Sequence, residues 1–416
     1  MKIGILTFHR AYNYGAILQC YSLMKKMQDS FPDCSIEVID YASSNMMSEY
    51  ETNSLFKKIH KSMVANDFII SFKLLVKYLM DLPKRSKKKL FVSNRNKSIA
   101  KGLDFLSLSS KKLISDDIDS FVKYVESNSY DIIVVGSDAI WNDCQTMVPN
   151  FYYLKGIMKS RKFSYAASMH GLKYKLLPED RIEYVKNALC EFDYIGVRDV
   201  ETEKYVHYVS KNLKTYHNCD PSIFLDLNKL PVSIESVKEK LVSKGINLNK
   251  PIIGLMCEDW LAKKIKEILG DKYQLVSVYE FNKYSDFNLD NLTPFEWAIV
   301  FSLFKATFTH FFHGTIFSLK NYTRTFAIEK KSSYSQKYKT KIHDLLDRLG
   351  LMECYFVKEE IDKTGWGKIV DILENTDENE EARYRELISN ALSTEANTFE
   401  SFRKAILNIK SSVRNG

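Results

Sequence analysis

Short apolar runs alternate with amphipathic helical patterns along the first part of this chain, and this alternation is the feature that most constrains its fold. We expect strands at residues 2–7, 36–41, 131–136, 162–167 and 194–198, and helices at 16–27, 118–126 and 181–189. Strands that are separated by helices pair in parallel, because each connection must cross the sheet. The sequence therefore predicts a doubly wound α/β fold.

The same alternation begins again after a turn-rich stretch at 218–231, which contains Asp220 and Pro221. Here we expect strands at 252–255, 273–278, 306–309 and 325–328, and helices at 260–269, 294–304 and 314–319. A chain of 416 residues is long enough for two hydrophobic cores. We predict a first α/β domain at 1–220, a second at 221–336, and a helical segment at 337–416 that packs on the domains.

A Lys-rich insertion at 55–105, with helical patterns broken at Pro83, interrupts the first domain. Residues 57–101 hold 13 Lys and Arg against two acids, so the basic character of a chain with net charge +8 is concentrated there. One interpretation is peripheral contact of 57–101 with an anionic membrane. The other is a solvated basic face. No nucleic-acid-binding motif accompanies the charge, so we do not expect a nucleic acid partner.

Several patterns are missing from the sequence. The N-terminal apolar run lacks a cleavage site, and no stretch approaches the length of a membrane-spanning helix. The seven Cys form no zinc-like spacing, so we expect reduced thiols, a cytoplasmic location and no metal site. Neither a dinucleotide-binding glycine pattern nor a P-loop is present, which disfavours those cofactors.

Ligands of open α/β sheets bind outside the carboxyl ends of the strands. Polar residues that follow the expected strands are therefore the candidates for a site, namely Asn13, Tyr14, Gly15, Ser137, Asp138, Ser168, Arg198, His310, His313, Gly314 and Thr315. His313 would begin a helix whose free N–H groups, at Gly314 and Thr315, suit phosphate.

Each of these candidates also has a structural alternative. Asn13, Ser137 and Asp138 could instead cap helices. Arg198 could form a structural ion pair, and His313 could be a buried histidine without a catalytic role.

Seven ordered segments together resemble the polysaccharide pyruvyl transferase family. They are TFHRAYNYGAILQCYSL (7–23), VVGSDAIWN (134–142), SYAASMHG (164–171), IGVRD (195–199), DPSIFL (220–225), TPFEWA (293–298) and HFFHGTIFS (310–318). The resemblance implies two Rossmann-like domains that face each other across a cleft, as in GT-B glycosyltransferases. It further implies phosphoenolpyruvate as donor, a glycan or lipid-linked sugar as acceptor, a cyclic ketal product and no cofactor.

The resemblance also implies roles for individual residues. Arg198 would bind the donor's anionic groups, the His313–Gly314–Thr315 turn would hold or protonate its phosphate, and Asp138 would orient or deprotonate an acceptor hydroxyl. Many family members have Arg where this chain has Phe311, so either Arg324, Lys320 or His310 would supply a compensating cation, or the donor would differ. The alternatives are a glycosyltransferase that uses a nucleotide sugar and a non-catalytic glycan-binding protein.

Overall fold

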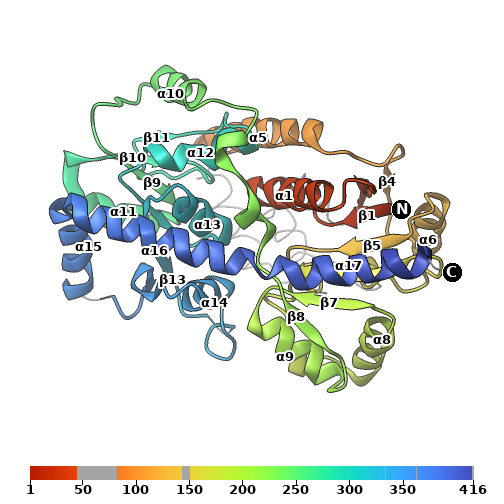
Figure 1. The fold of residues 1–416 in the computed structure, drawn as a ribbon. Helices are drawn as coiled ribbons and strands as arrows, with labels where there is room; N and C mark the ends of the chain where they lie inside the picture. Colours follow the sequence, from red (N-terminus) through yellow and green to blue (C-terminus); the bar gives the residue numbers. More distant parts are fainter. Residues whose placement is uncertain (45–81, 143–149, 333, 362, 415–416) are drawn as a thin grey trace, which may run out of the picture.

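A computed structural model describes residues 1–44, 82–142, 150–332, 334–361 and 363–414. It contains two parallel six-stranded sheets flanked by helices (Figure 1). The first has the order β2-β1-β5-β6-β7-β8, and the second β11-β10-β9-β12-β13-β14. The predicted pair of doubly wound α/β units is confirmed.

The first sheet contains all five strands that were predicted for it. Its strands are β1 (Lys2–Leu6), β2 (Ser35–Val38), β5 (Ile132–Val135), β6 (Arg161–Ala167), β7 (Tyr194–Val197) and β8 (Thr215–His217). A separate parallel pair joins β3 (Tyr41–Ala42) to β4 (Leu113–Ile114). Every residue of β5 is an Ile or Val and is buried, as is typical of a parallel strand covered on both faces.

The second sheet consists of β9 (Ile252–Met256), β10 (Gln274–Ser277), β11 (Phe287–Asn288), β12 (Ala306–Thr309), β13 (Arg324–Glu329) and β14 (Tyr355–Val357). Strand β14 lies in the segment from 337 onward that was expected to be almost wholly helical, and this strand was not predicted. The strand order reverses between β9 and β12, and in the first sheet between β1 and β5. Such reversals open a crevice at the carboxyl ends of the strands.

The helices have the following bounds: α1 (Tyr14–Ser30), α5 (Leu82–Ala100), α6 (Ile118–Ser127), α8 (Glu179–Leu189), α9 (Val200–Val209), α10 (Ile234–Ser243), α11 (Asp259–Leu269), α12 (Pro294–Val300), α13 (Phe312–Lys320), α14 (Lys341–Arg348), α15 (Lys363–Asn375), α16 (Glu378–Ala396) and α17 (Phe399–Arg414). Local sequence fixes several of their starts. Asp117 caps α6, and Thr293 forms a capping box with Glu296 at α12. No helix in these described ranges is both long enough and apolar enough to cross a bilayer.

Helix α1 joins the two units. Its first turn packs Ile17 and Leu18 into the core that contains Trp297 of α12. Further along the helix, Leu23 and Met27 pack beneath the first sheet. The loop that precedes α1 is therefore held between the two sheets.

The C-terminal helices α16 and α17 run along the length of the molecule (Figure 1). Ile388 of α16 packs in the core beside α13 and α14, whereas Phe402 and Ile406 of α17 pack against the first sheet. The predicted helical C-terminus thus ties the second unit back to the first.

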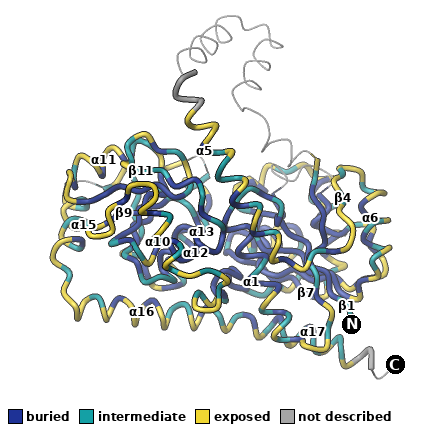
Figure 2. The backbone as a smooth tube through the Cα atoms, turned by 90° about the horizontal axis from the view of Figure 1, so that it is seen from above, coloured by how far each residue is buried: buried dark blue, intermediate teal, exposed yellow. Residues whose placement is uncertain are grey.

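Only the last part of the basic insertion lies within the described residues, and the expected amphipathic stretch at 68–79 lies outside them. The exposed early part of α5 projects from the body of the molecule (Figure 2). Lys87, Lys88 and Lys89 are exposed there. Nearer its end, Arg95 donates a 2.8 Å hydrogen bond to the carbonyl oxygen of Tyr279, which anchors α5 on the second unit.

Candidate active site

The structure brings the three central candidates together. Asp138 follows β5, Arg198 follows β7, and His313 lies in the first turn of α13, directly after β12. Nη2 of Arg198 lies 3.8 Å from Oδ1 of Asp138. Asp138 has a φ of 87°, an uncommon backbone conformation for a residue other than glycine and one that often marks functional sites.

Asp220 links Arg198 to His313, although it was not among the site residues predicted from the sequence. Its Oδ2 accepts a 2.9 Å hydrogen bond from Nη1 of Arg198 and lies 3.7 Å from Nε2 of His313. Its Oδ1 accepts from the N–H of Ser222 at 2.9 Å. Burial raises the pKa of Asp220, but His313, Arg198 and the Ser222 N–H together lower it further, so the net pKa is below the ordinary value.

Arg198 is buried, and some of its N–H donors are not used in hydrogen bonds within the described chain. Its side chain is 1% exposed, and Nη1 binds Asp220 and, at 3.4 Å, the hydroxyl of Ser137. Within the described chain, its Nε and Nη2 have no hydrogen-bond acceptor. A buried donor that lacks an acceptor costs about 1–3 kcal/mol. A ligand with anionic oxygens would remove that cost.

Lys341 is a second cation of the cluster and was not predicted. It begins α14, and its Nζ lies 5.3 Å from the centroid of the Phe312 ring, which the Arg198 guanidinium approaches to 4.7 Å. Burial lowers the pKa of Lys341, while Asp138 opposes this shift. Arg198 and Lys341 therefore place two positive charges beside the start of α13.

The first turn of α13 carries free N–H donors, although not all of the expected ones. Within the described residues, the N–H groups of Phe312, His313 and Gly314 donate no hydrogen bond. The N–H of Thr315, however, donates to the carbonyl of Phe311 at 3.0 Å, so the expected free N–H at Thr315 was wrong. Among the described residues, Nε2 of His313 is also buried without a hydrogen-bond partner, and its contact with Asp220 is an ion-pair distance of 3.7 Å. These donors suit an anion.

The start of α1 lies against the imidazole of His313, because a methyl group added at Gly15 would lie 2.1 Å from Cγ of the ring. The Asn13 side chain accepts a 2.9 Å hydrogen bond from the N–H of Gly15 and so caps α1, which is the structural alternative for Asn13. Tyr14 is fully buried and stacks on Trp297, with 5.2 Å between ring centroids. Tyr14 therefore packs between the two units.

Ser168 and Arg324 do not join the cluster. Ser168 donates a 2.6 Å hydrogen bond to Asp199, the residue that caps α9. Arg324 lies at the amino end of β13, where its guanidinium is 4.0 Å from the Tyr384 ring centroid. Lys320 also lies apart, because its Nζ donates to the carbonyl of Ile223. Lys341, in contrast, is a cation that lies near the cluster.

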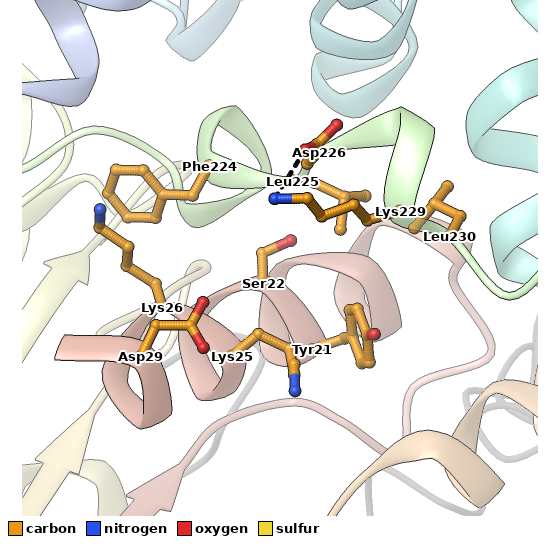
Figure 3. A pocket seen from close by; sticks show the side chains of 10 residues that line it. All are labelled: Tyr21, Ser22, Lys25, Lys26, Asp29, Phe224, Leu225, Asp226, Lys229 and Leu230. Atoms are coloured by element: carbon orange, nitrogen blue, oxygen red, sulfur yellow. Dashed lines mark ion pairs between the residues drawn. The ribbon is translucent and has the colours of Figure 1, made fainter. Parts of the chain in front are cut away.

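His310 lines a cavity of about 320 Å³ that lies near the cluster, because Thr340 of its wall directly precedes Lys341. The cavity lies between the end of β6 in the first sheet and the ends of β9, β12 and β13 in the second. A separate cavity of about 340 Å³ lies between α1 and residues 224–230, and its wall includes Lys25, Lys26, Lys229, Asp29 and Asp226 (Figure 3). None of the predicted site residues lines this second cavity.

Solved structures confirm the predicted two-domain fold. One is a UDP-GlcNAc 2-epimerase from Neisseria meningitidis bound to UDP-GlcNAc, with TM-score 0.57, 8% identity, and coverage of 98% of this chain and 100% of that one. Another is a glycosyltransferase from Rickettsia africae, with TM-score 0.53, 10% identity, and coverage of 98% of each chain. Both are GT-B-like folds of two Rossmann-like domains, and at these identities they show the fold alone.

The remaining comparisons concern the sequence. No curated protein matches this chain significantly. The family model for polysaccharide pyruvyl transferase matches residues 13–332, which include Asp138, Arg198, Asp220 and His313. The chain therefore belongs to the polysaccharide pyruvyl transferase family.

Proposed function

We propose that this protein transfers a pyruvyl group from phosphoenolpyruvate to two hydroxyls of a surface glycan or its lipid-linked precursor. The observation that carries the proposal is the set of buried, unsatisfied donors on Arg198 and His313 beside Lys341 and the free N–H groups of α13. Phosphoenolpyruvate has a carboxylate and a phosphate on one small skeleton, so it can satisfy several such donors at once.

The positions of these donors suggest how the donor substrate binds. The free N–H groups of α13 and the Lys341 ammonium suit the phosphate, because both concentrate positive charge at the start of the helix. The unused edge of the Arg198 guanidinium suits the carboxylate. Asp220 fixes the guanidinium and faces the His313 ring. In this assignment Asp220 is a positioning residue.

The reaction needs proton transfer but no redox step. Protonation of C3 of phosphoenolpyruvate makes C2 electrophilic, and an acceptor hydroxyl attacks C2. The bond between C2 and the phosphate oxygen then breaks, and a second hydroxyl closes the ketal ring. Of the two hydroxyl protons, one balances the proton gained by C3 and the other leaves with phosphate.

Two side chains are placed to move these protons. Burial raises the pKa of Asp138, but Arg198, Lys341 and His313 lower it further, so at neutral pH this carboxylate is ionised and can accept a hydroxyl proton. His313 lies at the phosphate end, where it can donate a proton to the leaving group. Proton transfer of this kind typically contributes about 10²–10⁴ to a rate.

We also propose where in the cell the protein acts. Phosphoenolpyruvate and a lipid-linked acceptor would meet in the cytoplasm at the inner face of the membrane. The exposed Lys87, Lys88 and Lys89 of α5 give the protein a basic surface for peripheral contact with anionic lipid.

The test is a reaction of the full chain with phosphoenolpyruvate and a panel of methyl hexosides, followed by ³¹P NMR and mass spectrometry. We expect inorganic phosphate and a pyruvylated sugar only when both substrates are present. His313→Ala should reduce the rate at least about 100-fold, whereas His207→Ala, at an exposed histidine, should not.

Parallel reactions with UDP-GlcNAc test the alternative donor, which is the ligand of the Neisseria epimerase structure. Turnover of UDP-GlcNAc without turnover of phosphoenolpyruvate would contradict the proposal. Sugar binding without turnover of either donor would instead support a non-catalytic glycan-binding protein.

A further inference from the structure

The cavity of about 320 Å³ near the donor cluster is not part of the proposed binding site for phosphoenolpyruvate. Its walls come from both units, with His170 after β6, Glu258 and Trp260 after β9, and Lys330 after β13. Strands β9 and β12 are the pair between which the order of the second sheet reverses. The cavity therefore lies where ligands of such sheets bind.

Three short connections join this cavity to the donor cluster. The carbonyl of Asp138 accepts a 2.9 Å hydrogen bond from the N–H of Ser168, two residues before His170. Thr340, which lines the cavity, directly precedes Lys341. His310 lies three residues before His313. A molecule in the cavity would consequently lie next to the groups assigned to the donor.

The lysine of the cavity wall is already paired with a carboxylate. Lys330 forms an ion pair with Glu258, and Glu329 accepts a 2.5 Å hydrogen bond from Thr340. Burial lowers the pKa of His170 to about 3, so this imidazole is neutral at physiological pH. The wall thus offers a neutral imidazole, an internally neutralised ion pair and the Glu329 carboxyl group, which accepts from a hydroxyl, unlike the cationic donor cluster.

Aromatic rings complete the wall. The indole N–H of Trp260 donates a 2.5 Å hydrogen bond to Glu258, and the ammonium groups of Lys330 and Lys358 lie 5.2 and 4.3 Å from its ring centroids. Tyr334 stacks on Tyr338 with 4.9 Å between centroids. Both aromatic residues are therefore held in fixed orientations.

This chemistry favours one class of ligand. Apolar C–H faces and many neutral hydroxyls are typical of a sugar, and they match fixed aromatic rings beside neutral donors and acceptors. A nucleoside diphosphate would need unpaired cations, whereas Lys330 is already paired with Glu258. The volume is at the lower end of small-molecule sites, which suits one or two sugar units.

We infer that the cavity lined by His170, Trp260, Glu258 and Tyr334 is the acceptor subsite, and that it binds a neutral hexose unit with its hydroxyls directed toward Asp138. The role as an acceptor subsite rests on the proposed function. Sugar binding in the cavity can nevertheless be measured without turnover.

The test uses saturation-transfer NMR on the full chain with methyl glycosides of glucose, galactose, mannose and N-acetylglucosamine. We expect saturation transfer to at least one sugar, and a decrease of at least about tenfold in its affinity in both Trp260→Ala and Tyr334→Ala. Trp366→Ala is the matched control, because Trp366 is a half-buried tryptophan of the same core cluster as Trp260 and does not line the cavity.

Turnover measurements provide a second readout. In the two cavity variants the KM for the sugar should rise while the KM for phosphoenolpyruvate stays within about twofold of wild type. Circular dichroism must show that each variant is folded, and the more conservative Trp260→Phe should restore part of the sugar affinity. A structural defect would instead change both KM values together.

Two results would overturn the inference: saturation transfer to none of the four sugars, or transfer that the cavity variants leave unchanged. Displacement of the sugar by UDP, with loss of UDP binding in both variants, would assign the cavity to a nucleotide and also contradict it. Failure of the proposed function would give a different result. The protein would then bind the sugar but not phosphoenolpyruvate.

Discussion

Gly15 lies directly against the imidazole of His313, so close that a methyl group at position 15 would lie 2.1 Å from Cγ of the ring. Gly15→Ala should therefore displace His313 while leaving the helix cap at Asn13 in place. Because small displacements of a reacting group can cost about 10²-fold in rate, we expect a loss of that order in kcat. Steady-state phosphate release measures it.

Gly367→Ala is the control for that variant. Apart from the backbone of α15 itself, no atom of the described residues lies within 4 Å of the methyl group that it would add, so it should preserve activity and stabilise the protein by about 0.5–1 kcal/mol. Wild-type kcat in Gly15→Ala would show that contact with Gly15 does not determine the position of His313.

Lys341 should contribute to the binding of the donor, since its ammonium group lies beside the Phe312 ring that Arg198 also contacts. Lys341→Met should weaken phosphoenolpyruvate binding by about 1.5–3 kcal/mol, or about 10- to 150-fold, and Lys341→Arg should restore part of it. Fluorescence or calorimetric titration measures the change. The exposed Lys337→Met is the control, and equal affinities in the two Met variants would exclude this role.

Asp220 should make folding sensitive to acid. Its folded-state pKa is lowered relative to the unfolded value of about 3.9, so its stabilising contribution is complete above that value and is lost as the pH falls toward the folded pKa. Asp220→Asn should lower the unfolding free energy by about 3–5 kcal/mol at pH 7, because it leaves buried Arg198 without its carboxylate.

Urea titrations at pH 7 and pH 3 measure both effects. The wild type should lose more stability than Asp220→Asn between these two values of pH. An identical loss of stability in both proteins would mean that Asp220 does not cause the acid sensitivity of folding.

The basic start of α5 should bind anionic membranes. Replacement of Lys87, Lys88 and Lys89 by Ala should weaken binding to vesicles that contain phosphatidylglycerol by about 1 kcal/mol per lysine, with little effect on neutral vesicles. Vesicle sedimentation at low and high salt measures it. Replacement of three other exposed lysines, Lys173, Lys175 and Lys211, is the control, and equal losses in both triple variants would indicate non-specific attraction.

The elements that could be predicted from sequence are those with strong local signals. Strand β5 is a continuous Ile-Val run, and α6 has a capping aspartate. Strand β8, Thr-Tyr-His, has no such run and is only half-buried. Because β8 was missed, Asp220 was interpreted as part of a linker, although it follows a strand of the first sheet just as Asp138 and Arg198 do.

Lys341 had no local signal at all. It lies in a polar stretch, and only the return of α14 toward Arg198 and Phe312 gives it a position in the site. Conversely, Asn13 fits its role as a helix cap, which local sequence also predicts. Long-range packing thus determined which of the polar strand-end residues form the cluster.

The central claim is that Arg198 and His313 form one binding site for phosphoenolpyruvate, and isothermal titration of the full chain tests it most directly. We predict saturable binding of phosphoenolpyruvate by the wild type, and a decrease in affinity of at least about tenfold in both Arg198→Lys and His313→Ala. Absence of binding to the folded wild type, or equal affinity in all three proteins, would contradict the account.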